Sequence, residues 1–174
     1  MRTLVLGGIR SGKSRWSEAA FDPDGPVRYV ATGPVADADS AWAARVGAHR
    51  GRRPATWETV ETAEVASQLR TVPHTATLVD DLGGWLTTAL DRRGWDDGSV
   101  DGDVDELVSA VRDFSAPLVL VSPEVGLTVV PATASGRRFA DELGTLNQHL
   151  AQCCDRVVLV VAGLPVWIKP TEVS

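Results

Sequence analysis

A glycine-rich segment near the start of the chain, residues 7–14, has the residue types that a phosphate-binding loop needs. Its letters GGIRSGKS match the pattern G-x-x-x-x-G-K-S/T. Glycines allow a tight turn that brings backbone N–H groups against phosphate oxygens, and a helix behind the loop would point its positive dipole end at the same oxygens. The candidate nucleotide-binding residues are Gly7, Gly8, Ile9, Arg10, Ser11, Gly12, Lys13 and Ser14.

Two side chains of this loop have specific expected roles. Lys13 is predicted to reach the β- and γ-phosphates of a nucleoside triphosphate, and the Ser14 hydroxyl is predicted to bind Mg²⁺. Such a site also needs a carboxylate for the metal at the end of a neighbouring strand. Asp80, in TLVDD, is the candidate ligand, whereas strand alternation points Asp81 elsewhere. The alternative is an ordinary pair of aspartates in a turn.

A histidine among arginines is the second chemically informative feature. His49 lies in RVGAHRGRRP, close to Arg45, Arg50, Arg52 and Arg53. Neighbouring positive charge disfavours the imidazolium form, so the ring would be a neutral nucleophile. Arginines can hold a polyphosphate and absorb charge that develops at phosphorus. The alternative is a solvated basic helix end, where arginines are also favourable.

Short apolar runs alternate with helical patterns along the whole chain. Alternation of strands and helices predicts a mostly parallel sheet with helices on both faces, an α/β fold. Strands are expected at 3–6, 27–31, 77–80, 118–122 and 156–163, with a sixth at 166–169 hairpinned behind Gly163 and Pro165. Helices are expected at 13–21, 37–48, 102–114 and 136–152, and a polar loop between two helices at 91–103.

Composition limits the class of protein. With 174 residues, we expect one domain, residues 1–174. The net charge of −6 argues against nucleic-acid binding and favours a protein that handles small molecules. The sequence holds no apolar run long enough for a membrane span and no signal peptide, so a cytoplasmic protein is expected. The adjacent Cys153 and Cys154 are interpreted as two thiols near a helix end.

Several stretches together resemble one family, the bifunctional adenosylcobinamide kinase/adenosylcobinamide-phosphate guanylyltransferases of cobalamin biosynthesis. The resemblance runs from about residue 3 to residue 169. The stretches that carry it are GGIRSGKS (7–14), YVATG (29–33), ARVGAHRGRRPATWETVE (44–61), VSPEVGLTVVP (121–131), GRRFADELGTLNQHLA (136–151) and VVLVVAGLPVWIK (157–169). Their order and spacing make the combination far more specific than the phosphate loop alone.

The resemblance implies two reactions. The first phosphorylates adenosylcobinamide from ATP or GTP, and the second transfers GMP from GTP onto that phosphate with release of pyrophosphate. It implies that His49 carries the GMP as a covalent intermediate, that Mg²⁺ assists, and that the chain is a homotrimer with a RecA-like P-loop NTPase fold. Further nucleotide-binding positions implied by the motifs are Ala31, Thr32, Gly33, Arg50, Gly51, Arg52, Arg53, Glu61 and Asp80.

The sequence departs from the family pattern at a few positions. Pro123 stands where Asn is usual, which removes a side-chain amide and a backbone donor and puts the kinase activity or subunit packing in question. Thr128 stands where Gly is usual, and Ala48 leaves His49 as the only histidine of its segment. After Asp80, the turn carries Asp81, Gly83 and Gly84 in place of commoner cysteine, threonine or bulky residues.

Three other functions compete with this interpretation. A simple P-loop kinase of a small metabolite would form no covalent nucleotide adduct, and a nucleotide-binding regulatory module would bind without turnover. A nucleic-acid ATPase is disfavoured by the acidic charge and the lack of an extended basic face. The guanine-reading sequence N-K-x-D is absent, which argues against a regulatory switch GTPase.

Overall fold

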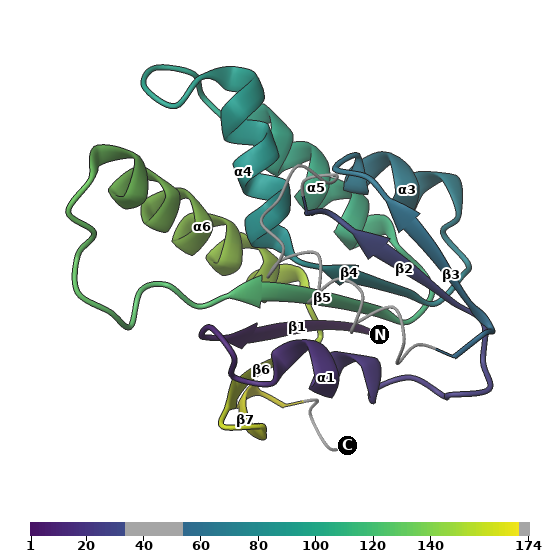
Figure 1. Ribbon diagram of the computed structural model, residues 1–174. Coiled ribbons are helices and arrows are strands. Elements are labelled where there is room, and N and C mark those ends of the chain that lie inside the picture. The colour runs from purple at the N-terminus through teal and green to yellow at the C-terminus, as the bar shows by residue number, and fades with distance from the viewer. Residues whose placement is uncertain (34–53, 171–174) are drawn as a thin grey trace.

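The computed structural model describes residues 1–33 and 54–170, which form a seven-stranded sheet covered by helices on both faces (Figure 1). The strands are β1 (Arg2–Gly7), β2 (Val27–Ala31), β3 (Trp57–Glu61), β4 (Thr77–Asp80), β5 (Leu118–Pro123), β6 (Arg156–Val161) and β7 (Leu164–Lys169). The helices are α1 (Lys13–Glu18), α3 (Val65–Thr71), α4 (Leu82–Arg93), α5 (Asp101–Asp113) and α6 (Ala134–Cys153). The strand order is β3-β2-β4-β5-β1-β6-β7.

Every strand pair in this sheet is parallel except β6 with β7. Because parallel strands end at the same edge, the residues that follow β1, β2 and β4 come together at one edge of the sheet. β7 returns antiparallel after a tight turn in which Ala162 and Gly163 have positive φ, 50° and 82°. The phosphate-binding segment follows β1 at the edge where the parallel strands end.

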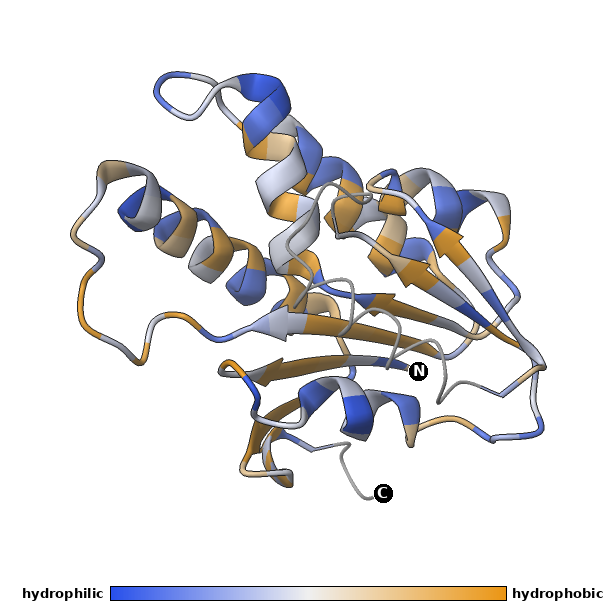
Figure 2. Ribbon diagram, in the orientation of Figure 1, coloured by the Kyte–Doolittle hydropathy of each residue, from blue (hydrophilic) through white to orange (hydrophobic). Residues whose placement is uncertain are grey.

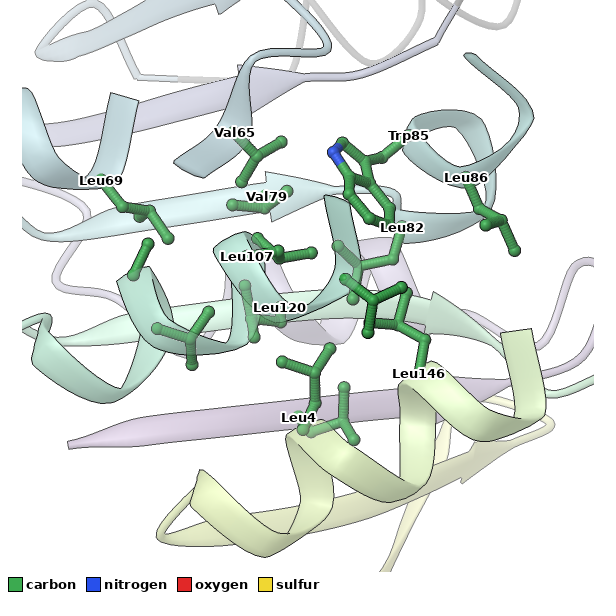
Figure 3. Packing of buried hydrophobic residues seen from close by; sticks show 14 of the residues in the cluster. Leu4, Val65, Leu69, Val79, Leu82, Trp85, Leu86, Leu107, Leu120 and Leu146 are labelled. Carbon is green, nitrogen blue, oxygen red and sulfur yellow. The ribbon is translucent and has the colours of Figure 1, made fainter. Parts of the chain in front are cut away.

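Alternation along the central strands divides the core into two layers. Leu4 of β1 and Leu120 of β5 face α4, α5 and α6, where Leu107 and Leu146 pack against them (Figure 3). Val5 and Val121 belong to a second cluster on the opposite face, which Trp16 of α1 helps to cover. The central strands are therefore buried on both faces, as their unbroken apolar runs predicted.

The hydropathy of the residues differs between the buried strands and the outer sides of the helices. The strands in the middle of the sheet are the most apolar part of the fold, and the helices are polar on their outer sides (Figure 2). α6 shows the pattern clearly, since Leu143, Leu146 and Leu150 are fully buried while Gln148 and His149 are exposed. The prediction of amphipathic helices over 102–114 and 136–152 is confirmed by α5 and α6.

Some predicted elements need correction. The first helix ends at Glu18 rather than at residue 21. The stretch 91–103 is a loop only between Arg93 and Asp101, because α4 continues to Arg93 and α5 begins at Asp101. The strand at 156–163 stops at Val161, and Pro165 lies inside β7 rather than in the turn. The predicted helix at 37–48 lies outside the described residues.

The sequence analysis did not identify β3. Its residues Glu58, Thr59 and Glu61 are exposed polar side chains, which a strand at the sheet edge tolerates. α4 carries Gly83, Gly84 and two threonines, which are weak helix formers. Its helix is stabilised by tertiary packing, since Leu82, Leu86 and Leu90 are fully buried.

The strand order also corrects one expectation about the site. Asp80 was expected on a strand next to the strand that leads into the phosphate loop. In the structure β5 lies between β4 and β1, so one strand separates Asp80 from the loop.

Among the described residues, no helix is long and apolar enough to cross a bilayer.

Candidate active site

The phosphate-binding segment forms a compact turn between β1 and α1. Arg10 and Gly12 have positive φ, 56° and 93°, and the Ser11 amide donates a hydrogen bond to the Gly8 carbonyl at 3.3 Å. Gly7 admits no side chain without a shift of the backbone, because a Cβ there would lie 2.9 Å from the Val160 carbonyl oxygen and would also meet Ser11 Oγ. No side chain caps the N-terminus of α1, which leaves its first amides available to an anion.

The turn between β6 and β7 supports this loop from outside. The Gly163 amide donates to the Ser11 carbonyl at 2.7 Å, and a Cβ on Gly12 would lie 3.1 Å from Gly163 Cα. Ser11 Oγ is buried and has no hydrogen-bond partner among the described residues. A buried hydroxyl with free bonding capacity suits a site that receives a polar ligand.

Gly12→Ala should destabilise the protein by about 1–2 kcal/mol, because a side chain at positive φ is disfavoured and the new Cβ would crowd Gly163. Urea unfolding followed by circular dichroism measures the change. The matched control is Gly144→Ala, in the middle of α6 with open space around the new Cβ. That variant should gain about 0.5–1 kcal/mol. Equal stability of the two variants would contradict the assigned loop conformation.

The side chain of Lys13 folds back onto the phosphate-binding segment. Its Nζ donates to the Gly8 carbonyl at 3.3 Å, and its charge lowers the pKa of Asp81 against the stronger effect of burial. The ammonium group is therefore held over the turn. Its contact with the outer phosphates of a triphosphate stays a prediction.

Asp80 is oriented by a tyrosine of the neighbouring strand. The Tyr29 hydroxyl donates to Asp80 Oδ2 at 2.6 Å, and Tyr29 is only 2% exposed. Leu78, two residues before Asp80, packs in the cluster on the α1 face, so alternation places the Asp80 carboxylate on the face of the phosphate loop. Tyr29 thus engages one of the two carboxylate oxygens of Asp80.

These residues fit a magnesium–nucleotide complex. Mg²⁺ is usually held by one or two protein oxygens together with phosphates and waters rather than by a full protein cage. Ser14 and Asp80 supply one hydroxyl and one carboxylate, and no group of three or more histidine, cysteine or acidic side chains forms a metal cage within the described part of the chain. One hydroxyl and one carboxylate are the kind of donors that Mg²⁺ takes when it is carried by phosphates.

Asp81 has a structural role. Its Oδ1 accepts a hydrogen bond from the Gly84 amide at 2.9 Å and so caps α4. Burial raises the pKa of this carboxyl, opposed by the hydrogen bond from Gly84. The peptide bond between Asp80 and Asp81 is cis. The Asp81 carboxylate is therefore engaged at the N-terminus of α4.

The turn after β2 lies at the same sheet edge. The Thr32 hydroxyl donates to the Asp81 carbonyl, and the Thr32 amide donates to the Asp80 carbonyl at 3.3 Å. Ala31 pairs with Asp80 on one side and with Glu61 of β3 on the other. The structure therefore brings together Ala31, Thr32, Gly33, Glu61 and Asp80, which the motifs had placed in one site.

The histidine segment is the remaining part of the predicted site. His49, Arg50, Gly51, Arg52 and Arg53 all lie outside the described residues, and so do Arg45 and Ala48. Gly33, the last described residue before this segment, belongs to the turn that packs against Gly84 at the site edge. The nucleophilic role of His49 therefore stays a prediction.

Two departures from the family pattern contact each other. A Cβ on Gly83 would lie 2.9 Å from Pro123 Cγ, so the proline ring occupies the space above this glycine. Pro123 is in register with Gly7 at the end of β1, and the next amide, from Glu124, donates to the Gly7 carbonyl at 3.0 Å. The Leu118 amide also donates to β1, at the Met1 carbonyl, and N–H groups alternate sides along a strand. The missing N–H of Pro123 therefore faces away from β1, and the hydrogen bonds between β5 and β1 continue to the phosphate loop.

Three supporting residues escaped the sequence analysis. Tyr29 orients Asp80, Gly163 holds the loop, and Asn147 donates to the Pro123 carbonyl at 3.2 Å while accepting from Ser122 Oγ at 2.6 Å. Two of them had a detectable signal: Tyr29 is the only tyrosine of the chain, and Asn147 is a polar residue within the buried stripe of α6. The local sequence carries no signal for the role of Gly163, because that role depends on a contact across the sheet.

A parallel sheet, a glycine loop after its first strand and a carboxylate at the end of β4 define the class: an α/β protein with a P-loop NTPase fold. Comparison with known families narrows this further. The model for the family "Cobinamide kinase / cobinamide phosphate guanyltransferase" matches residues 3–168. The chain belongs to this family.

Two bacterial proteins are similar to this chain over nearly its whole length, and one solved structure is similar at a lower level. The bifunctional adenosylcobalamin biosynthesis protein CobP of Pseudomonas aeruginosa is 40% identical, with 97% of this chain and 98% of that protein covered. CobU of Salmonella typhimurium is 37% identical, with 97% and 100% covered. The bacteriophage phi6 P4 protein, solved in complex with ADP, aligns with 98% of this chain and 55% of its own, at a TM-score of 0.49 and 18% identity.

Proposed function

We propose that this protein phosphorylates adenosylcobinamide from ATP or GTP and then transfers GMP from GTP to the adenosylcobinamide phosphate. The observation that carries the proposal is the phosphate loop at residues 7–14. The loop and Asp80 follow parallel strands that end on the same side of the sheet, in a chain that matches the family along nearly its whole length. The products are adenosylcobinamide-GDP and pyrophosphate.

In the kinase step, the hydroxyl of the corrinoid side chain attacks the γ-phosphorus of the bound triphosphate. The loop amides and Lys13 hold the β- and γ-phosphates in place, which positions the phosphorus and stabilises its developing charge. Ser14 and Asp80 would hold a Mg²⁺ ion that is carried with the nucleotide, and the ion would neutralise part of the phosphate charge. The hydrogen bond from Tyr29 fixes the orientation of the Asp80 carboxylate.

In the transfer step, a His49 ring nitrogen attacks the α-phosphorus of GTP. A nitrogen–phosphorus bond forms, the α–β oxygen–phosphorus bond breaks, and pyrophosphate leaves while the loop still holds its oxygens. An oxygen of adenosylcobinamide phosphate then attacks the same phosphorus and displaces the imidazole. Two displacements allow one nucleotide site to serve a large second substrate.

The two reactions can be tested with purified protein and adenosylcobinamide. With ATP and Mg²⁺ the expected product is adenosylcobinamide phosphate, and addition of GTP should convert it to adenosylcobinamide-GDP with one pyrophosphate per product. Liquid chromatography with mass detection separates the three corrinoids. Phosphorylation without guanylylation would reduce the proposal to a simple kinase, and nucleotide binding without either product would reduce it to a non-catalytic module.

We also propose that three chains assemble. The supporting observation is β7, an edge strand whose Leu164, Val166 and Ile168 share one face and are 70%, 53% and 57% exposed. An exposed apolar edge strand of this kind is a common association surface.

Placing a charge on this edge should separate the subunits. Val166→Lys is expected to convert the trimer to a monomer, because a lysine on an edge strand blocks pairing with another chain. Light scattering coupled to size-exclusion chromatography gives the mass directly. Gln148→Lys, on the exposed side of α6, is the matched control and should leave the mass unchanged. A wild-type protein that already runs as a monomer would contradict the assembly.

A further inference from the structure

An open hollow lies near the start of β1, at the opposite end of this strand from the phosphate loop. It has a volume of about 480 Å³, and its lining includes Arg2, Arg112, Cys153, Cys154, Asp155 and Lys169. Pockets of this size accommodate small organic ligands. β1 runs from this hollow at Arg2 to the loop at Gly7, roughly 16 Å away at 3.3 Å per residue. The hollow is therefore separate from the nucleotide site.

The two adjacent thiols at the hollow differ in accessibility. Cys153 is partly exposed at the end of α6, whereas Cys154 is only 1% exposed and packs in the main core cluster. Both are free thiols, and each shifts the pKa of the other. The protonated form of Cys153 also donates to the Leu150 carbonyl at 3.4 Å. Only Cys153 can meet a reagent from solution.

The surroundings favour a thiolate at Cys153. The hydrogen bond from Cys154, aided by the charges of Arg2 and Arg112, lowers the pKa of Cys153 to about 7 against the opposing effect of burial. The same hydrogen bond, together with burial, raises the pKa of Cys154. The outer cysteine is thus the reactive thiol, and the inner one stays protonated and donates to it.

The cations around the hollow are not equally available. Arg2 is paired with Asp155 at 3.0 Å, and Lys169 Nζ donates to the Cys154 carbonyl at 2.6 Å and the Ala151 carbonyl at 3.1 Å. Arg112 is exposed and has no ion-pair partner within the described residues. A ligand with a carboxylate would meet this free guanidinium beside the reactive sulfur.

We propose that Cys153 is a thiol-modification site that forms a mixed disulfide with a low-molecular-weight disulfide bearing carboxylate groups. The Cys153 thiolate attacks one sulfur of the disulfide, a new S–S bond forms and the old one breaks. The displaced thiolate leaves and takes a proton from water. Cys153 is oxidised and the released half is reduced. Cys154 stays reduced, because its buried and protonated thiol does not attack the new bond.

Oxidised glutathione is a suitable probe, with the neutral 2-hydroxyethyl disulfide as comparison. Peptide mapping by mass spectrometry should find one adduct, on Cys153, and none in Cys153→Ser. Arg112→Gln should slow the reaction with oxidised glutathione about threefold, as expected for one surface charge pair, and leave the neutral reagent unaffected. An adduct on Cys154, a Cys153–Cys154 disulfide, no adduct, or equal slowing with both reagents would each overturn the proposal.

A pH profile gives an independent test. Alkylation of Cys153 by iodoacetamide should reach half its maximal rate near pH 7, below the pKa of about 8.5 of an ordinary thiol. In Cys154→Ala the midpoint should rise, because the hydrogen bond to the thiolate is lost. A wild-type midpoint near that of a free thiol would contradict the activated cysteine.

This site is independent of the proposed catalytic function. Modified protein should bind the triphosphate as tightly as unmodified protein, since the hollow and the loop lie at opposite ends of β1. If the corrinoid assays fail, the proposal for Cys153 still stands. If the cysteine reactions fail, the proposal for the two transferase steps still stands.

Discussion

His49→Ala should abolish the transfer of GMP while the phosphorylation of adenosylcobinamide continues. The variant lacks the nitrogen that forms the covalent bond to phosphorus, and removal of a catalytic nucleophile lowers turnover by roughly 10⁴-fold or more. Incubation with GTP labelled at the α-phosphate, in the presence of Mg²⁺, should label the wild-type protein. The label should be acid-labile and alkali-stable, as expected of a phosphoramidate, and the variant should carry none.

A second histidine variant separates this effect from a general loss of structure. His149 is exposed on α6, and His149→Ala should keep the full label and both activities. Label that persists in His49→Ala would show that another residue carries the nucleotide. Loss of both activities in His49→Ala, with normal folding by circular dichroism, would show that the histidine segment serves the kinase step as well.

Lys13→Ala should weaken the binding of ATP and GTP by about 10- to 100-fold. The lysine ammonium is expected to make charge-assisted hydrogen bonds to the outer phosphates, and such bonds are worth about 1.5–3 kcal/mol. Both reactions use the same loop, so both should lose activity together. Isothermal titration with a non-hydrolysable triphosphate measures the affinity directly, and a nucleoside monophosphate should show a smaller loss because it lacks those phosphates.

Arg70→Ala is the matched control for the loss of one positive charge. Arg70 lies on α3, is exposed, and pairs with Glu106 at 2.5 Å. Its removal should leave nucleotide affinity unchanged, because exposed ion pairs contribute little and act over short range. A Lys13→Ala protein with wild-type affinity for the triphosphate would contradict the assignment of residues 7–14 as the nucleotide site.

The local features of the site could be read from the sequence. The glycine pattern predicted a backbone turn, and the structure has positive φ at Arg10 and Gly12 within it. The apolar run before Asp80 predicted a buried strand that ends in a carboxylate, and β4 ends at that residue. These predictions succeed because backbone freedom, alternation and helical spacing are properties of neighbouring residues.

The remaining features depend on residues far apart in the sequence. Tyr29 and Asp80 meet because β2 pairs with β4 in one register. Gly163 supports Ser11 because β6 lies beside β1. β3 and α4 form despite polar or weakly helical sequences, since the sheet edge and the packed leucines stabilise them.

The sequence by itself therefore determined the phosphate-binding turn, the α/β alternation and the family. Tertiary structure alone decided that β5 separates β4 from β1, that Pro123 fills the space above Gly83, and that two cysteines meet two arginines at the far edge. The physical reason is that strand order and side-chain contacts are selected by long-range pairing and burial, which local composition does not encode.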